Sequence, residues 1–250
     1  MIDKLLQPVK KRVKTVLRRA GFEVSRYSIE NSRTLRAGAR LKAANVDLVL
    51  DVGANIGQFA LELREVGYDK RIISFEPLHD AYLNLQKNSN RDPMWDVAPR
   101  CGLGSKSCIA TINVSANSWS SSFLPITSKH TKAAPSSAYI GAEMVEILTL
   151  DGLMLNEVCK ARSPYLKIDT QGYEWEVLEG AKEVLNYLCG IQLEVSLLPL
   201  YEGQPEFLKI LDKIQRLGFE LYDIEPEFYD QQKSRLMQLN VIFMKKNYNK

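Results

Sequence analysis

Short apolar segments alternate with helical patterns along most of this chain. The spacing predicts strands over five apolar runs, at 46–51, 71–76, about 94–99, 164–169 and 189–195. Between several of these runs, apolar residues recur at helical spacing, over 59–66, 177–188 and 207–214. This alternation predicts an α/β fold, a doubly wound sheet of mostly parallel strands with helices on both faces.

The two ends of the chain and one internal segment depart from this alternation. Residues 219–224 and 239–245 flank a polar stretch without helical spacing, which predicts an antiparallel strand pair at the sheet edge. Residues 33–45 have the pattern of a helix ending at Asn45. We therefore expect an N-terminal helical extension over 1–45 and one domain over 46–250.

One long insertion is expected inside that domain. Residues 107–115 have the pattern of an additional strand, and 115–141 are rich in Ser, Pro and Ala without a clear period. Unstructured connections of this length are usually functional, so we expect the inserted loop at about 115–141 to contribute to a site.

Composition and charge exclude several classes of protein. The 250 residues are 45% hydrophobic and 25% charged, as in an ordinary globular domain. Seven Lys and Arg residues lie in 1–20, so the rest of the chain is slightly acidic despite a net charge of +3, and no nucleic-acid partner is expected.

No apolar run is long enough for a membrane span or a secretory signal. The four cysteines form no CxxC pair, which predicts reduced thiols and a cytoplasmic protein without a zinc site. The oligomeric state stays open.

The basic start of the chain predicts an amphipathic helix over residues 8–20. One interpretation is peripheral contact with an anionic membrane surface, and the other is a helix that packs its short apolar face on the domain. The apolar face comprises Val9, Val13, Val16, Leu17 and Ala20, and the opposite face comprises Lys10, Lys11, Arg12, Lys14, Arg18 and Arg19.

The segment `DVGANIGQF`, residues 51–59, joins the first strand to a helix through a glycine turn. Its G-x-x-x-G spacing lacks the middle glycine of the dinucleotide fingerprint, and no Lys-Ser/Thr pair follows as in a phosphate loop. The turn therefore suits a nucleoside without phosphates, whose amino group can contact Asp51. Glu76 ends the next strand, 23 residues after Gly53, where an acidic residue can accept the ribose hydroxyls.

Further polar signals fall at the carboxyl ends of the other predicted strands. The turn `CGLGS`, residues 101–105, can lie against a base. Asp169 ends the fourth strand, and Glu194 interrupts the apolar fifth strand. Because open α/β sheets bind ligands outside the carboxyl ends of their strands, these signals indicate one crevice.

Six motifs in this order, over residues 46–245, resemble the FkbM-type S-adenosylmethionine-dependent methyltransferases: `DVGANIGQF`, `SFEP`, `SS` within 120–122, `LTLDGL`, `LKIDTQGYEWEVLEGA` and `LEVS`. The resemblance implies a class I, Rossmann-like methyltransferase fold, a seven-stranded sheet with its last strand antiparallel. It also implies S-adenosyl-L-methionine as cofactor and methyl transfer to oxygen. Acceptors in such families include sugar hydroxyls of glycans and glycolipids, and polyketide hydroxyls.

The resemblance also assigns residues to the parts of the site. The cofactor-binding residues that it implies are Asp51, Gly53, Asn55 and Gly57 on the methionine side, Glu76 at the ribose, and Gly102 and Leu103 at the adenine. Asp169 matches the acid of the family's `KID` element. Gln171 stands where the family usually has a second acid, so a mechanism that needs a carboxylate there is in doubt.

Asp169 is the first candidate for the base that accepts the acceptor proton, and Glu194 is the second. The structural alternatives are a helix cap for Asp169 and a buried acid held by backbone donors for Glu194. His130 lies in the Ser-rich insertion and either faces the acceptor or is a plain surface histidine. Ser121, Ser122 and Gln171 are candidate substrate contacts, the serines alternatively being ordinary loop residues. Asp169 and Glu194 alone give too few ligands to predict a metal.

These features together predict an O-methyltransferase that acts on a hydroxyl, with a sugar in a glycan or glycolipid as the favoured acceptor. A polyketide or other small-molecule hydroxyl is an alternative acceptor. Two other classes stay open, a nicotinamide-dependent oxidoreductase, which the missing middle glycine opposes, and a non-catalytic adenosine-binding module.

Overall fold

The computed structural model describes residues 2–246, with side chains from residue 11 onward. Its helices are α1 (Ile2–Arg19), α2 (Arg33–Ala43), α3 (Gln58–Glu65), α4 (His79–Ser89), α5 (Ser128–Ala133), α6 (Leu150–Lys160), α7 (Glu174–Glu179) and α8 (Phe207–Arg216), with short 3-10 turns η1 (Pro135–Ser137) and η2 (Val184–Asn186). Its strands are β1 (Leu48–Val52), β2 (Arg71–Phe75), β3 (Trp95–Val97), β4 (Gly102–Leu103), β5 (Cys108–Ser115), β6 (Tyr139–Leu148), β7 (Pro164–Ile168), β8 (Gly190–Ser196), β9 (Phe219–Asp230) and β10 (Arg235–Lys245).

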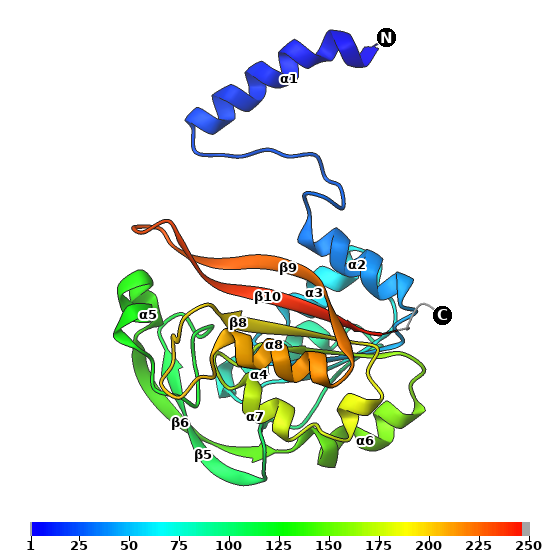
Figure 1. The fold of residues 1–250 in the computed structure, drawn as a ribbon, viewed down its shortest axis with the longest axis vertical. Coiled ribbons are helices and arrows are strands. Elements are labelled where there is room, and N and C mark those ends of the chain that lie inside the picture. The colour runs from blue at the N-terminus through cyan, green and yellow to red at the C-terminus, as the bar shows by residue number, and fades with distance from the viewer. Residues whose placement is uncertain (1, 247–250) are drawn as a thin grey trace.

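Seven strands form the main sheet, in the order β3-β2-β1-β7-β8-β10-β9 (Figure 1). The pairs β2–β3, β1–β2, β1–β7 and β7–β8 are parallel, and β10 is antiparallel to both of its neighbours, β8 and β9. The predicted α/β, mostly parallel, seven-stranded fold with an antiparallel last strand is therefore confirmed.

Alternate residues of the central strands pack into cores on opposite faces of the sheet. Leu50 and Leu166 belong to one cluster, together with residues of α6, α7 and α8. Val49 and Tyr165, their neighbours along the chain, belong to the other. Burial on both faces explains why these strands read as continuous apolar runs rather than alternating ones.

Helix α2 covers part of the second core. The hydroxyl of Ser32 caps it by accepting from the backbone N–H of Leu35, and Ala37 and Leu41 are buried against the sheet. After the helix, Asn45 has a left-handed backbone with φ 48°, which ends the helical path as predicted. The helix is thus packed into the folded body, although it precedes Val46.

The predicted insertion contributes β5 and the start of β6 to a second, three-stranded sheet in the order β4-β6-β5. Strand β5 confirms the strand expected at 107–115. The segment 115–141, expected to be a loop, contains α5, η1 and the start of β6. The small sheet lies beside the main sheet, and the connection from β5 to α5 reaches the carboxyl end of the parallel strands (Figure 1).

The two C-terminal strands are longer than predicted. The stretch expected as a polar loop, 225–238, is mostly strand, and only residues 231–234 separate β9 from β10. The prediction was wrong because polar and apolar side chains alternate here, with Gln238 and Asn240 on one face and Leu239 and Val241 in the core. Alternation at period two is typical of strands.

Helix α1 stands apart from the domain, joined to α2 by an extended segment (Figure 1). Among the residues that the structure describes, no helix combines the length and the apolar character needed to cross a membrane.

Candidate active site

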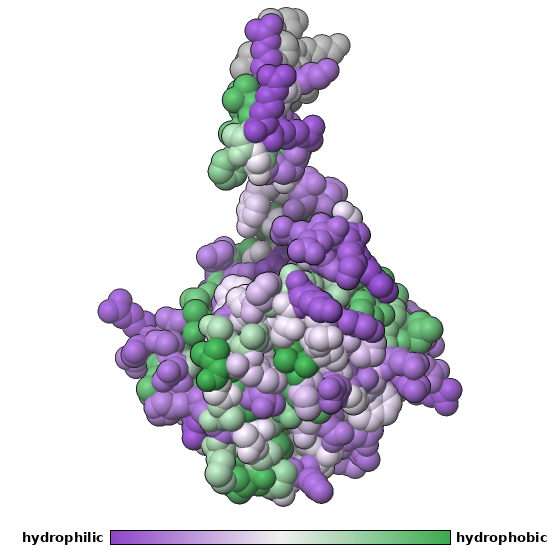
Figure 2. All heavy atoms as spheres, turned by 90° about the vertical axis from the view of Figure 1, so that its left-hand side faces the viewer, coloured by the Kyte–Doolittle hydropathy of each residue, from purple (hydrophilic) through white to green (hydrophobic). Residues whose placement is uncertain are grey.

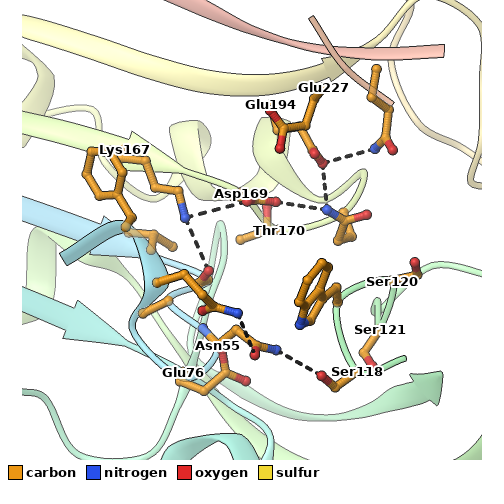
Figure 3. A pocket seen from close by; sticks show the side chains of 18 of the residues that line it. Asn55, Glu76, Ser118, Ser120, Ser121, Lys167, Asp169, Thr170, Glu194 and Glu227 are labelled. Carbon is orange, nitrogen blue, oxygen red and sulfur yellow. Dashed lines mark hydrogen bonds and ion pairs between the residues drawn. The ribbon is translucent and has the colours of Figure 1, made fainter. Parts of the chain in front are cut away.

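A cleft of about 510 Å³ opens at the carboxyl ends of β1, β2, β7 and β8 (Figure 3). This volume is within the usual range for small-molecule sites. One end is bordered by the β1–α3 turn, the end of β2 and the small sheet, and the other by β8, β9, β10 and α2. Asp169 lies between the two ends, on the loop that follows β7.

The β1–α3 turn follows a tight left-handed path. Gly53 has φ 72°, and a Cβ added there would lie 1.9 Å from the carbonyl oxygen of Asp169. Gly57 has φ 94°, and its Cβ would lie 2.5 Å from the ring of Trp95. Only glycine fits either position. Gly53 and Asn55 line the cleft, whereas Gly57 packs behind the turn and sets the start of α3.

Asp51 lies beneath the cleft rather than in it. Its side chain is fully buried, and Oδ1 is 3.1 Å from Nζ of Lys167 on β7. The same Nζ donates to the carbonyl oxygen of Gly53 at 3.3 Å and lies 3.5 Å from the carboxylate of Asp169. Asp51 therefore forms an ion pair with Lys167 and is not free to contact the amino group of a ligand.

Glu76 presents a buried carboxylate to the cleft at the end of β2. The backbone N–H groups of Asn55 and Leu78 donate to its two oxygens at 2.8 and 2.9 Å. Burial raises the pKa of Glu76 to about 7, against the opposing effect of these two donors. The second lone pairs of both oxygens stay available, so this group can accept the two hydroxyls of a ribose.

The wall beside Glu76 is apolar and narrow. Leu78, Leu103 and Ile112 are buried there, and the backbone of Gly102 runs close to the ring of Phe123, where a Cβ would lie 2.6 Å away. A flat, mostly apolar base fits such a slot, and the carboxylate next to it matches a ribose. The residues present therefore fit the nucleoside part of S-adenosyl-L-methionine.

Asp169, Gln171 and Glu194 form one hydrogen-bonded group at the centre of the cleft. Asp169 and Glu194 are labelled in Figure 3. Nε2 of Gln171 donates to Asp169 Oδ1 at 2.8 Å and to Glu194 Oε2 at 2.6 Å. Tyr201 donates to Gln171 Oε1 at 2.8 Å, and Gln238 donates to Glu194 Oε2 at 2.9 Å. Gln171 has φ 54°, an uncommon backbone for a residue other than glycine, which this network holds in place.

Neither structural alternative for the two carboxylates describes what is found. Helix α7 begins at Glu174, and it is Glu174 that accepts from the backbone N–H groups of Thr170 and Gly172, so Asp169 is not the cap. Glu194 is held by side-chain amides instead of backbone donors. Burial raises the pKa of Glu194 well above its usual range, and the neighbouring carboxylate of Asp169 raises it further.

The insertion supplies one rim of the cleft. The side-chain amide of Asn55 donates to Ser118 Oγ at 3.3 Å, which ties residues 117–121 to the β1–α3 turn. Ser121 lines the cleft, and its hydroxyl accepts from the backbone N–H of Ser115. Ser122 instead donates to the carbonyl oxygen of Gln171 at 2.7 Å, so it supports the loop from behind.

His130 is not the surface histidine that the sequence also allowed. It is 2% exposed, and its ring packs edge-on against Tyr201 with the centroids 5.3 Å apart. Burial lowers the pKa of His130 to about 4, so the ring is neutral at pH 7. It lines the same end of the cleft as Phe228.

Several polar residues on β8, β9 and β10 that line the cleft were not predicted from the sequence. Asn240 pairs in register with Glu194 on one side and with Glu225 on the other, which places the three on one row across the sheet. The available signal was polar residues at every second position in `GIQLEVS` and `MQLNV`. The missed lining residues are Arg33, Trp119, Lys167, Gln192, Glu225, Glu227, Phe228, Gln238 and Asn240.

The sheet order, its antiparallel last strand and a nucleoside-shaped cleft at the strand ends define a class I methyltransferase fold. Residues 51–221 match the family described as the methyltransferase FkbM domain, and the chain belongs to this family, whose methyl donor is S-adenosylmethionine. Within the described residues, no group of three or more His, Cys, Asp or Glu is arranged to hold a metal ion.

One relative is the hexuronic acid methyltransferase AglP of Haloferax volcanii, 28% identical over 155 residues. That match covers 62% of this chain and 58% of the relative. Similar solved structures include Sp1610 of Streptococcus pneumoniae in complex with S-adenosyl-L-methionine, which is 13% identical with a TM-score of 0.46. That match covers 86% of this chain and 72% of Sp1610. Another is a TehB-like S-adenosylmethionine-dependent methyltransferase of Corynebacterium glutamicum, which is 12% identical with a TM-score of 0.41. That match covers 98% of this chain and 100% of the other.

The pKa of Glu76 leads to a pH dependence of cofactor binding. Ribose hydroxyls donate to the ionised carboxylate, so binding favours loss of the proton, and affinity should rise as the pH increases through about 7. We expect the Kd for S-adenosylmethionine to be about tenfold lower at pH 8 than at pH 6. Calorimetry in buffers of different ionisation enthalpy should show proton release, and Glu76→Gln should bind weakly and without this pH dependence. A wild-type Kd that stays constant from pH 6 to 8 contradicts the assignment.

Gln171 should act by positioning the two carboxylates. Gln171→Glu replaces a donor by a third negative group beside Asp169 and Glu194, and like charges hold protons more tightly. We expect the acid limb of the kcat profile to move to higher pH by about one unit or more, with the Kd for S-adenosylmethionine unchanged. Tyr201→Phe is the matched control. It removes the hydroxyl that donates to Gln171 Oε1 but leaves the bonds from Gln171 Nε2 to Asp169 and Glu194, so the acid limb of its kcat profile should stay at the wild-type pH. An unmoved limb in Gln171→Glu would exclude the positioning role.

Proposed function

We propose that this protein transfers a methyl group from S-adenosylmethionine to a hydroxyl oxygen of a neutral sugar in a glycan or glycolipid. The observation that carries the proposal is the continuity of the cleft. It runs from Glu76 and Leu103, which fit the nucleoside, past Asp169 to the buried polar face of β8, β10 and β9. A hydroxylated acceptor that enters from the polar end reaches Asp169 before it reaches the nucleoside end.

The chain's own residues divide the work between binding, orientation and proton transfer. When bound, S-adenosylmethionine supplies a methyl group that is already activated on a sulfonium. Asp169 is one-third exposed in the cleft, so its carboxylate can accept the proton of the acceptor hydroxyl. Gln171 holds that carboxylate in place through its amide. Alignment of the acceptor oxygen supplies the larger share of the rate, up to roughly 7–11 kcal/mol in well-oriented systems.

Glu194 has a separate role beside Asp169. Its raised pKa means that it holds a proton more readily than an exposed glutamate does. Two amide groups donate to Oε2, so a proton on this side chain resides on Oε1, which can donate to an acceptor oxygen. Glu194 is therefore suited to orient the sugar, while Asp169 takes the proton.

The polar end of the cleft suits hydroxyl groups. Gln192, Gln238 and Asn240 offer amide donors and acceptors from neighbouring strands, and Trp119 and Phe228 offer aromatic surface. Trp119 is 65% exposed, so its ring can lie against a bound sugar. A few placed polar groups beside aromatic faces are the usual composition of a small-molecule site.

The charges at this end favour a neutral sugar over a uronate. Among the described residues, the cations that line the cleft are Arg33 and Lys167. Arg33 is paired with Glu227 at 2.6 Å and with Glu62 at 3.3 Å, and Lys167 is paired with Asp51. The carboxylates of Asp169, Glu194 and Glu225 line the same space, and Glu225 is paired with Arg36 at 3.4 Å. An acidic sugar such as that named for the relative AglP would meet negative charge here.

An acceptor panel tests this function. With labelled S-adenosylmethionine, neutral glycans and glycolipids should be methylated with kcat/KM at least about tenfold above their hexuronic acid counterparts. Glu227→Gln removes the closer of the two carboxylates paired with Arg33 and should reduce this preference for neutral acceptors, whereas Glu220→Gln, an exposed residue on the same strand, should keep it. Transfer to polyketide hydroxyls alone, or a preference for uronates by the wild type, would refute the proposal.

Asp169→Asn should abolish the proton acceptor with little change in shape. We expect the fold and the Kd for S-adenosylmethionine to be retained and kcat to fall by about 10²-fold or more. Asp212→Asn, the same change at an exposed position on α8, should turn over like the wild type. Normal turnover by Asp169→Asn would transfer the role of base to Glu194 or His130, which single-turnover rates of Glu194→Gln and His130→Gln would then separate.

A further inference from the structure

The N-terminal segment before α2 carries an unusual amount of exposed apolar surface. Its exposed large apolar side chains are Val13 at 51%, Val16 at 65%, Phe22 at 64%, Val24 at 45%, Tyr27 at 70% and Ile29 at 54%. Isolated exposed apolar residues are normal on protein surfaces, but a group within seventeen consecutive residues marks an interaction site.

The same segment is strongly basic. Between residues 11 and 26 it has six exposed cations, Lys11, Arg12, Lys14, Arg18, Arg19 and Arg26. The single acid among them, Glu23, is already paired with Arg18 at 2.6 Å. The domain behind it is slightly acidic, so the positive charge is a property of this segment alone.

The two kinds of residue lie on different sides of α1. At 100° per residue, Val13, Val16, Leu17 and Ala20 fall within one narrow arc, and Lys11, Lys14, Arg18 and Arg19 fall outside it. Figure 2 shows hydrophobic residues gathered on one side of the projecting segment, with hydrophilic ones beside them. In the sequence, the apolar spacing continues back to Ile2, Leu5 and Leu6.

The domain does not cover this surface. Figure 1 shows α1 away from the sheets and their helices. Within residues 11–26, the described side-chain hydrogen bonds and ion pairs are local, joining Thr15 to the carbonyl oxygen of Lys11 and Arg18 to Glu23. The interpretation in which the helix packs its apolar face on the domain is thus not the arrangement in this structure.

We propose that α1 and the segment to Ile29 bind the surface of an anionic lipid bilayer. A helix with a narrow apolar arc flanked by Lys and Arg lies in the interface, with its cations at the lipid headgroups. In the extended segment, Tyr27 is of a residue type enriched at the membrane–water interface, and Phe22 is of a type that inserts into the bilayer surface. A nucleic acid would use the cations and leave the apolar arc in water. This binding is separate from methyl transfer, since it needs neither cofactor nor acceptor.

Co-sedimentation of the full chain with vesicles tests the proposal. The probes are phosphatidylcholine vesicles and the same vesicles with about one third phosphatidylserine, each at low and high salt. We expect binding at least tenfold tighter to the anionic vesicles at low salt, and weaker binding in high salt. The triple variant Val13→Asn/Val16→Asn/Leu17→Asn should lose at least tenfold in affinity.

The matched control removes three exposed apolar side chains from the small sheet instead. Ile109, Ile140 and Met144 are 63%, 71% and 72% exposed, and their replacement by Asn should leave vesicle binding unchanged. Cofactor binding by calorimetry shows whether each variant is folded. Equal pelleting of the helix variant and the wild type on anionic vesicles would overturn the proposal. So would lipid-free association through this segment, detected by light scattering and lost in the helix variant, when anionic vesicles bind no protein.

Discussion

The site depends on one buried ion pair, between Asp51 on β1 and Lys167 on β7. Burial alone would lower the pKa of Lys167, but Asp51 and Asp169 outweigh it, so the pKa is raised and the lysine stays charged. Its Nζ lies 3.1 Å from Asp51, 3.5 Å from Asp169 and 3.3 Å from the carbonyl oxygen of Gly53. One cation therefore joins the cofactor turn to the catalytic loop. Loss of Lys167 would leave the buried carboxylate of Asp51 without its counter-charge, which typically costs 3–5 kcal/mol.

Gly53 lies against the carbonyl oxygen of Asp169, so the two loops cannot come closer together, and Lys167 contacts both of them. The carboxylate of Asp169 is thus fixed relative to the cofactor turn before any ligand binds. On its other side, Gln171 connects Asp169 to Glu194, and Gln238 connects Glu194 to β10. Preorganised polar groups of this kind need little rearrangement during a reaction. A buried polar face is costly unless it is satisfied, and here the amides of Gln171 and Gln238 donate to the carboxylates, while Oε1 of Gln192 has no partner among the described residues.

The sequence predicted the parallel strands, the glycine turn, the position of Glu76 and the location of Asp169, because each leaves a local pattern. It could not show that Asp51 belongs to Lys167, since that pair depends on the register of β1 against β7, which places the two side by side. The burial of His130 also depends on distant chain segments, as Tyr201 and Phe228 cover it. The polar row of β8 to β10 was a different case. Glu194 and Asn240 fall in strands that the sequence predicted, but their neighbours Glu225 and Gln238 lie in the stretch that was expected as a polar loop.

The position of α2 relates the basic segment to the active site. Arg33, Thr34 and Ala37 of α2 line the polar end of the cleft, the end where we propose that the acceptor enters. The extended segment from α1 joins the domain at this same helix, through Ser32. A bilayer bound by α1 would therefore lie on the side of the domain from which the acceptor arrives. A sugar attached to a lipid would then need only to bend from the headgroup layer into the cleft, and its local concentration would be set by the membrane rather than by solution. Of the two proposed acceptors, a glycan and a glycolipid, only the glycolipid would use both the membrane contact of α1 and the polar end of the cleft.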